Sequence, residues 1–183
     1  SQEISIRSIK LIFFFGFLKH GLIFKKSYVD YLFKAAKKVY EDIEYAVVQR
    51  NNHSITEACF LIIFGKIFDH TSFGLDCFSK GKNIIEKGIQ KQFFEDGTYI
   101  QNSITYQRFA IQSIMLSYQF LKNSLSKNSL LKLCQVVEFF NYNIFDDDGN
   151  FPNYGPNDGA MLFNFGIADY RDLRPVTNLL SYS

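Results

Sequence analysis

The chain has 183 residues, enough for one domain with a core of ordinary size. Twenty Lys and Arg residues are balanced by 18 Asp and Glu residues, giving a formal net charge of +2. This balance argues against a nucleic-acid-binding protein, which usually carries a clustered basic face. The densest basic run, Lys25 to Lys38, is interpreted as the solvated face of a helix.

Apolar residues recur with helical spacing along most of the chain, and no alternating strand pattern of useful length occurs. The pattern predicts six helices joined by short polar or glycine-containing connections. Expected helices span 3–18, 28–49, 53–68, 79–94, 104–123 and 128–145, with capping residues at Ser27, Ser103 and Ser126 or Lys127 and flexible connections at Gly74 and Gly97.

The expected helices are of two kinds. The segments Ile55 to Phe68 and Phe109 to Leu121 are apolar on nearly every side, so they have to be buried all round. The segment Lys80 to Asp96 carries one apolar stripe, ending in Phe93 and Phe94, and should face water on its other side. Alternating enclosed and half-exposed helices predict an all-α fold: a single (α/α) toroid domain over residues 1–183, an incomplete ring of antiparallel helix pairs with no substantial sheet.

Three cysteines and one apolar run are assigned to the core. Cys59, Cys77 and Cys134 are too far apart for a zinc site and odd in number, so they are expected to be buried free thiols. The apolar run Leu11 to Leu18 is far shorter than the roughly 20 residues of a membrane-spanning helix, so no membrane span is expected. No signal peptide is expected before this run, and the chain is expected to be an excerpt from a longer protein.

A long loop begins at Asp146, and its glycines, prolines and aspartates continue to about residue 160. Loops of this length inside compact domains are often functional. The aspartates at its start imitate a calcium-binding loop but lack the closing Glu, so a solvated turn is favoured. In the charged patch after the loop, Arg171 and Arg174 can clamp carboxylates, or more commonly pair with Asp169 and Asp172.

Three motifs occur in order along the chain. Asn51-Asn52-His53 precedes one enclosed helix, Asp96-Gly97 leads through Ser103 to Tyr106 at the start of the other, and the loop from Pro152 to Ala160 is followed by Asp169 to Pro175. Together they resemble the heparinase II/III-like family, whose toroid carries an Asn-Asn-His motif at one helix start and a DG…S…Y motif before the next inner helix. The third motif looks like family members from surface-polysaccharide gene clusters.

The resemblance implies a polysaccharide lyase that cleaves an acidic, uronate-containing polysaccharide by β-elimination, with no nucleic-acid partner. Removing the C5 proton beside a carboxylate adds negative charge, which a hydrogen bond from an amide or imidazole offsets. Asn52 would take this role, with His53 as a second donor or a base, and Tyr106 would protonate the leaving O4 and, in some stereochemistries, first remove the C5 proton. Candidate substrate-binding residues are Gln101, Asn102, Gln107, Arg108, Asn157, Asp158, Arg171 and Arg174.

The sequence departs from the family pattern in two ways. Gln101 and Gln107 stand where many members have Glu and His, and the family's C-terminal β-sandwich, expected as an intramolecular partner that supplies a further His or Tyr, is absent from this chain. No cofactor or metal is expected, since His53 and Glu57 share a helix face without a third ligand. The resemblance suggests a bacterial periplasmic or secreted protein, and the residues leave localisation open.

Other interpretations remain open. Asn51 or Asn52 can simply cap a helix, and Tyr106 can belong to the core. The toroid can also be a non-catalytic glycan-binding or assembly module in surface-polysaccharide biosynthesis. A glycoside hydrolase on a similar ring would need two carboxylates across the scissile bond, for which the candidates are Glu57, Asp96 and Asp158.

Overall fold

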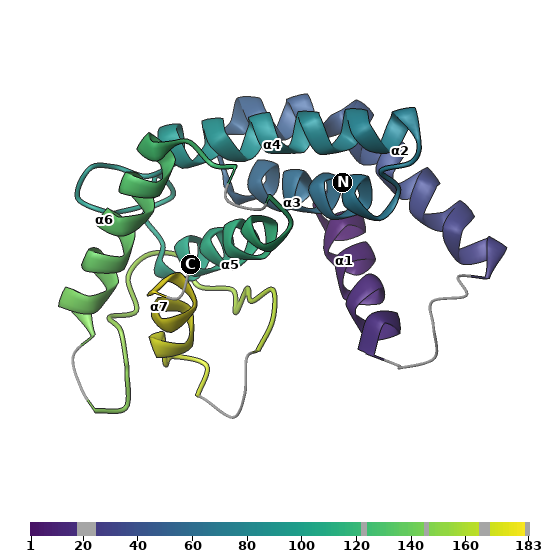
Figure 1. Ribbon diagram of the computed structural model, residues 1–183. Helices are drawn as coiled ribbons and strands as arrows, with labels where there is room; N and C mark the ends of the chain where they lie inside the picture. The colour runs from purple at the N-terminus through teal and green to yellow at the C-terminus, as the bar shows by residue number, and fades with distance from the viewer. Residues whose placement is uncertain (18–24, 122–123, 145–146, 165–168, 182–183) are drawn as a thin grey trace.

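The computed structural model describes residues 1–17, 25–121, 124–144, 147–164 and 169–181 (Figure 1). The regular secondary structure of this part of the chain is all-helical, which confirms the predicted fold class. Its β-structure is limited to isolated bridges, such as the one between Phe93 and Tyr99. None of its helices is long and apolar enough to span a bilayer. The helices are α1 (Gln2–Phe17), α2 (Lys26–Gln49), α3 (Asn52–Ile67), α4 (Ser72–Gln92), α5 (Ile104–Leu121), α6 (Lys127–Asn143) and α7 (Arg174–Ser181).

Several predicted helix ends are wrong. Helix α4 begins seven residues early because the Thr71 hydroxyl accepts a hydrogen bond from the Gly74 amide at 3.0 Å, so Gly74 lies in the first turn rather than in a connection. Ser27 lies inside α2 and does not cap it. Ser126 does cap α6, accepting from the Ser129 amide. Helix α7 was not predicted, because eight residues are too short for a helical period to show.

Helices α3 and α4 form an antiparallel pair in close contact. Glycines of α4 meet α3 in reverse order: Gly81 lies against Ala58 and Gly88 against Ile55. A Cβ atom at Gly81 would come within 2.8 Å of the Ala58 carbonyl oxygen, so only glycine allows this approach. The pair is the antiparallel unit that the toroid prediction requires.

Helix α5 covers the other side of α3 and runs parallel to it. The hydroxyl oxygens of Thr56 and Ser113 lie 3.3 Å apart. About one turn further along both helices, the Cys59 side chain hydrogen-bonds the Ser117 side chain. The order in Figure 1 is therefore α4, α3, α5 in successive layers, with α1 and α6 at opposite ends. Since α3 and α5 are parallel, both begin at the same end of the molecule. Closure of such layers into a ring remains a prediction.

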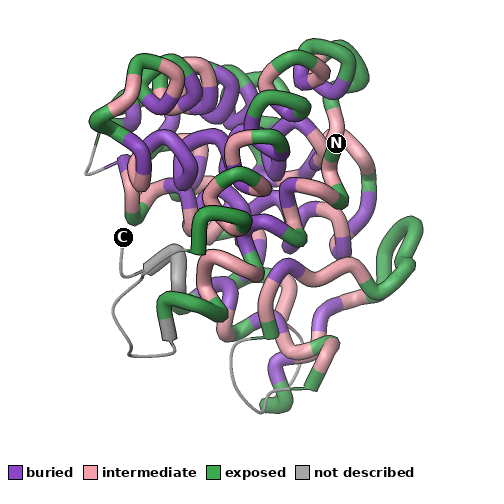
Figure 2. The backbone as a smooth tube through the Cα atoms, turned by 90° about the vertical axis from the view of Figure 1, so that its right-hand side faces the viewer, coloured by how far each residue is buried: buried purple, intermediate pink, exposed green. Residues whose placement is uncertain are grey.

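The burial pattern confirms that α3 and α5 are enclosed, because every residue from Ser54 to Gly65 of α3 and from Gln107 to Met115 of α5 is buried. Figure 2 shows buried backbone running through the interior of the molecule. The lysines of the basic run Lys25 to Lys38 are exposed, as predicted for a solvated face. The core around α3 is formed by α1, α2, α4 and α5, so the two helix starts that carry the motifs are held on rigid elements.

Three burial predictions are wrong. Phe94 is 50% exposed because α4 ends at Gln92 and the backbone becomes extended at Phe93, which sends successive side chains to opposite sides. Phe14 is 59% exposed and Phe15 is also exposed, because the second half of α1 projects beyond the helices that cover its first half (Figure 1). Cys134 is exposed on the outer face of α6. Leu18 of the same apolar run lies outside the described residues.

Candidate functional site

A pocket of about 420 Å³ opens at the common end of α3 and α5. Asn52 and His53 line it from the start of α3, and Tyr106 lines it from the start of α5. Gln101 and Asp158 complete the polar wall, while α1 contributes Gln2, Ile6 and Lys10. Three residues from two motifs far apart in the sequence therefore share one hollow.

The two asparagines at the start of α3 have different tasks. The Asn51 side chain is the helix cap and accepts the His53 backbone N–H at 3.1 Å. The Asn52 backbone N–H donates to the side-chain oxygen of Gln101 at 2.8 Å. Asn52 is 5% exposed, and no hydrogen bond joins its side-chain amide to another described residue. That amide is available to a ligand in the pocket.

His53 is half-buried at the pocket wall. Burial lowers the pKa of its imidazole below the ordinary value of 6.5. The ring is therefore neutral at pH 7, with one nitrogen able to accept a proton and the other able to donate a hydrogen bond.

A buried chain of hydrogen bonds fixes the start of α3 against the end of α4. The Tyr99 hydroxyl donates to Gln92 at 2.7 Å, and the Gln92 amide donates to the Ser54 hydroxyl at 3.0 Å. Ser54 in turn donates to the carbonyl of Asn51 at 2.9 Å. The sequence reasoning missed this network, whose only signal was a glutamine beside the apolar stripe of α4.

Tyr106 is held at the pocket by two groups. Ser103, confirmed as a capping residue, accepts the Tyr106 backbone N–H at 3.2 Å, and the Tyr106 hydroxyl donates to the Asp158 carboxylate at 3.1 Å. Partial desolvation, followed by the hydrogen bond and negative charge of Asp158, raises the pKa of the Tyr106 phenol. The phenol is therefore protonated at neutral pH and suited to donate a proton.

The loop that carries Asp158 rests on the start of α5. Ser103 donates to the Pro156 carbonyl at 2.6 Å, and the Ile104 amide donates to the Tyr154 carbonyl at 3.1 Å. Gly155, with φ +75°, sits so close to Asn102 that a Cβ atom would lie 1.8 Å from the Asn102 carbonyl oxygen. Asn102 thus lies beneath the loop and does not line the pocket.

Two side chains of α5 bind the backbone of the following loop. Arg108, 3% exposed, donates to the carbonyls of Ala160 and Tyr170 and stacks over the Tyr170 ring at 4.3 Å. Gln112 donates to the Phe163 carbonyl and accepts the Leu162 N–H, each at 2.9 Å. Arg108 does not line the pocket, so its observed contacts position the loop.

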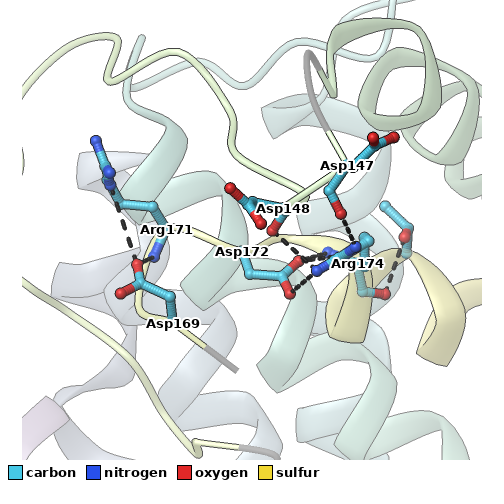
Figure 3. Close-up of polar contacts among 7 residues, drawn as sticks. Asp147, Asp148, Asp169, Arg171, Asp172 and Arg174 are labelled. Carbon is cyan, nitrogen blue, oxygen red and sulfur yellow. Dashed lines mark hydrogen bonds and ion pairs between the residues drawn. The ribbon is translucent and has the colours of Figure 1, made fainter. Parts of the chain in front are cut away.

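The remaining predicted substrate-binding residues also contact the protein itself. Gln107 is buried and donates to the Gly97 carbonyl at 2.7 Å, away from the pocket. Asn157 accepts the Tyr170 hydroxyl at 2.7 Å. Arg171 lies 4.0 Å from Asp169, and Arg174 pairs with Asp172 at 2.8 Å while binding the carbonyls of Asp147 and Asp148, as Figure 3 shows. These arginines make the carboxylate pairs that sequence analysis left open.

Lys10 is a charged residue of the pocket that sequence reasoning missed, together with its neighbours Gln2 and Ile6. It lies in α1, in a segment without a motif, and only the packing of α1 against α3 brings its cation to the pocket. Of the three carboxylates considered for a hydrolase, only Asp158 lines the pocket. Glu57 of α3 is buried away from it, and Asp96 accepts a hydrogen bond from Thr98 in a surface turn. The described residues hold no group of three or more His, Cys, Asp or Glu side chains able to bind a metal ion.

Comparison with known proteins identifies the family of the chain. No curated protein and no solved structure matches the chain. Residues 2–136 match the family described as Heparinase II/III N-terminus, a stretch that runs from α1 into α6 and includes Asn52, His53 and Tyr106. The chain therefore belongs to the heparinase II/III N-terminal family.

Proposed function

We propose that this pocket binds a uronate residue of an acidic polysaccharide and that its residues carry out β-elimination, as befits a family of polysaccharide lyases. The observation that carries the proposal is the meeting of an amide, a neutral imidazole and a protonated phenol in one hollow. These are the groups that the reaction needs to stabilise a carboxylate, accept a proton and donate one.

The electrostatics of the pocket favour an anionic ligand. Helices α3 and α5 are parallel and both begin here, so the positive ends of two helix dipoles face the same space. Lys10 adds a cation on one side, whereas Asp158 occupies the other. These charges favour a uronate carboxylate beside Asn52, His53 and Lys10, away from the repulsion of Asp158.

In this orientation the reaction proceeds with a balanced transfer of protons. The C5–H bond breaks, its proton passes to the free nitrogen of His53, and the Asn52 amide hydrogen-bonds the carboxylate as its charge grows. The C5 electron pair forms the C4–C5 double bond while the C4–O4 bond breaks. Tyr106 gives its proton to the departing O4, and one unsaturated and one saturated chain end result.

The test uses the full-length protein with candidate uronate polymers, including heparan, alginate and the surface polysaccharide of its source organism. Ultraviolet absorbance of the new double bond is measured. Tyr106→Phe should lower the rate by about 10²–10⁴-fold. Tyr142→Phe, which removes an exposed hydroxyl on α6, is the matched control and should leave the rate unchanged. Absence of unsaturated product from all of these polymers would contradict the proposal.

A second candidate is a glycan-binding or assembly module without catalysis. It is favoured by the Tyr106 hydroxyl being engaged with Asp158 and by Gln101 and Gln107 being engaged with backbone atoms. This function predicts that Tyr106→Phe preserves both polysaccharide affinity and the cellular phenotype. Lost turnover with intact binding in that variant would instead support the lyase.

A further inference from the structure

A second hollow lies on the outer side of the molecule, between α2 and α4. It has a volume of about 340 Å³, and we refer to it as the basic groove. Four cationic side chains line it, namely Arg50, Lys80, Lys87 and Lys91, against the single carboxylate of Glu44. Because the whole chain carries a formal charge of only +2, this concentration of positive charge is local.

Most of this charge is uncompensated. Lys80 pairs with Glu44 at 3.1 Å and also donates to the Tyr40 carbonyl, so one cation and the carboxylate offset each other. The side chains of Arg50, Lys87 and Lys91 form no ion pair with another described residue. Lys87 and Lys91 stand one helical turn apart, a spacing at which like charges destabilise a helix unless an anion joins them.

Arg50 reaches the groove from a strained backbone. Its φ of 49° places it in the left-handed region at the end of α2, where glycine or asparagine is the usual residue. The helix dipole accounts for a cation near the ends of α2 and α4, but not for Lys87, which lies further from the end of α4. A ligand in the groove accounts for all three unpaired cations.

The groove adjoins the pocket of the proposed lyase. Asn52 and His53 line the pocket, whereas Ser54, two residues beyond Asn52 and about 200° around the helix, lines the groove. The first turn of α3 therefore separates the two hollows. Neighbouring residues of that turn thus line both hollows.

We propose that the basic groove binds the carboxylate or sulfate groups of an acidic polysaccharide, outside the pocket where cleavage occurs; this rests on the proposed function. Val47, Val48 and Ile84 provide an apolar floor for the C–H faces of sugar rings. No aromatic residue lines the groove, and stacking of nucleic-acid bases requires one. An acidic glycan thus fits the lining better than single-stranded nucleic acid.

The test measures binding of long uronate oligosaccharides to the full-length protein carrying Tyr106→Phe, which leaves the ligand uncleaved. Adding Lys87→Ala and Lys91→Ala should weaken binding roughly three- to tenfold and make it less sensitive to salt. Adding Lys26→Ala and Lys34→Ala, two exposed lysines of α2 outside the groove, is the matched control with the same change in charge and should have no effect.

Three outcomes would overturn the proposal: equal loss in both double variants, no loss in either, or tighter binding of a single-stranded oligonucleotide of equal charge. Displacement of the oligosaccharide by inorganic sulfate at matched ionic strength would assign the groove to a small anion and also overturn the proposal.

Measurements of turnover separate the failure of the basic groove from the failure of the proposed lyase. With Tyr106 intact, the groove variant should raise the KM for long chains and leave kcat unchanged. If unsaturated product forms and the groove variant has an unchanged KM for long chains, the proposal for the basic groove is overturned and the lyase proposal is kept. If no polymer is cleaved but the groove variant binds more weakly, the lyase fails and the groove stands.

Discussion

The two sides of the pocket are built in different ways. Asn52, His53 and Tyr106 stand in the first turns of α3 and α5, the two enclosed helices, where buried hydrogen bonds hold the backbone. Asp158 faces them from an exposed loop that is attached to the start of α5 through the backbone carbonyls of Tyr154, Pro156 and Ala160. Segments with few buried apolar contacts open at lower free energy than core helices. The groups proposed to transfer protons are thus fixed, and the carboxylate that modulates Tyr106 lies on the side that moves more easily.

The adjacent asparagines give the largest expected effect on the helical side. Asn52→Ala removes the amide proposed to stabilise the developing charge, so kcat/KM should fall about 10²–10³-fold with little change in stability. Asn51→Ala removes the helix cap and should lower the free energy of unfolding by about 1 kcal/mol, with activity nearly kept at a permissive temperature. Steady-state kinetics and denaturant unfolding measure the two effects. If Asn52→Ala instead lowered stability and left kcat/KM unchanged, Asn52 would be the helix cap and would have no part in the reaction.

Two glycines of the loop test its attachment. Gly155→Ala places a methyl group against the Asn102 carbonyl and should lift the loop, increasing hydrogen exchange of the Ile104 amide roughly tenfold or more. Gly159→Ala carries a similar cost from positive φ, but its Cβ meets no atom within 4 Å, so the Ile104 amide should stay protected. Equal exchange in the two variants would show that backbone strain, and not the contact with Asn102, controls the loop.

Asp158→Asn should change the pH profile more than the maximal rate. The Asp158 carboxylate helps raise the pKa of Tyr106, and activity that needs the protonated phenol is lost as the pH rises through that pKa. Replacing the carboxylate by an amide lowers this pKa, so the high-pH limb should move to lower pH. The low-pH limb, which follows the depressed pKa of His53 below 6.5, should stay in place. Asp96→Asn, a change in a surface turn, serves as the control; an unshifted high-pH limb in Asp158→Asn would contradict the coupling.

Thiol labelling gives the smallest effect and checks how closed the helical side is. Cys59 and Cys77 are fully buried, and burial raises the pKa of each thiol to about 12. Within this chain a maleimide should therefore modify Cys134 alone in the native state, without loss of activity, as followed by mass spectrometry. Rapid modification of Cys59 would show that α3 opens and that the contrast between the two sides is overstated.

The sequence predicted correctly those parts of the molecule where the residue pattern is compatible with only one environment. A helix that is apolar all round has to be enclosed, and this placed α3 and α5 correctly. The ends of the helices were harder to predict. The start of α4 depends on a hydrogen bond to Thr71 and its end on the extended backbone of Phe93, and neither feature appears in the spacing of apolar residues. Lys10 was missed because its role depends on packing between distant segments. The backbone contacts of Gln107 and Arg108 could not be predicted, because a side chain that binds backbone atoms looks, in sequence, like one that binds a ligand.

Arg108 and Gln112 bind the following segment through its main-chain carbonyl and amide groups. Every amino acid offers the same carbonyl, and every one except proline offers the amide. Substitutions among residues 157–163 therefore preserve this attachment as long as the backbone path is kept. The outer rim of the pocket can therefore change in sequence while its attachment to the helices stays the same. Under the proposed function, this property makes the segment a practical target for variant libraries that test which sugars the pocket accepts.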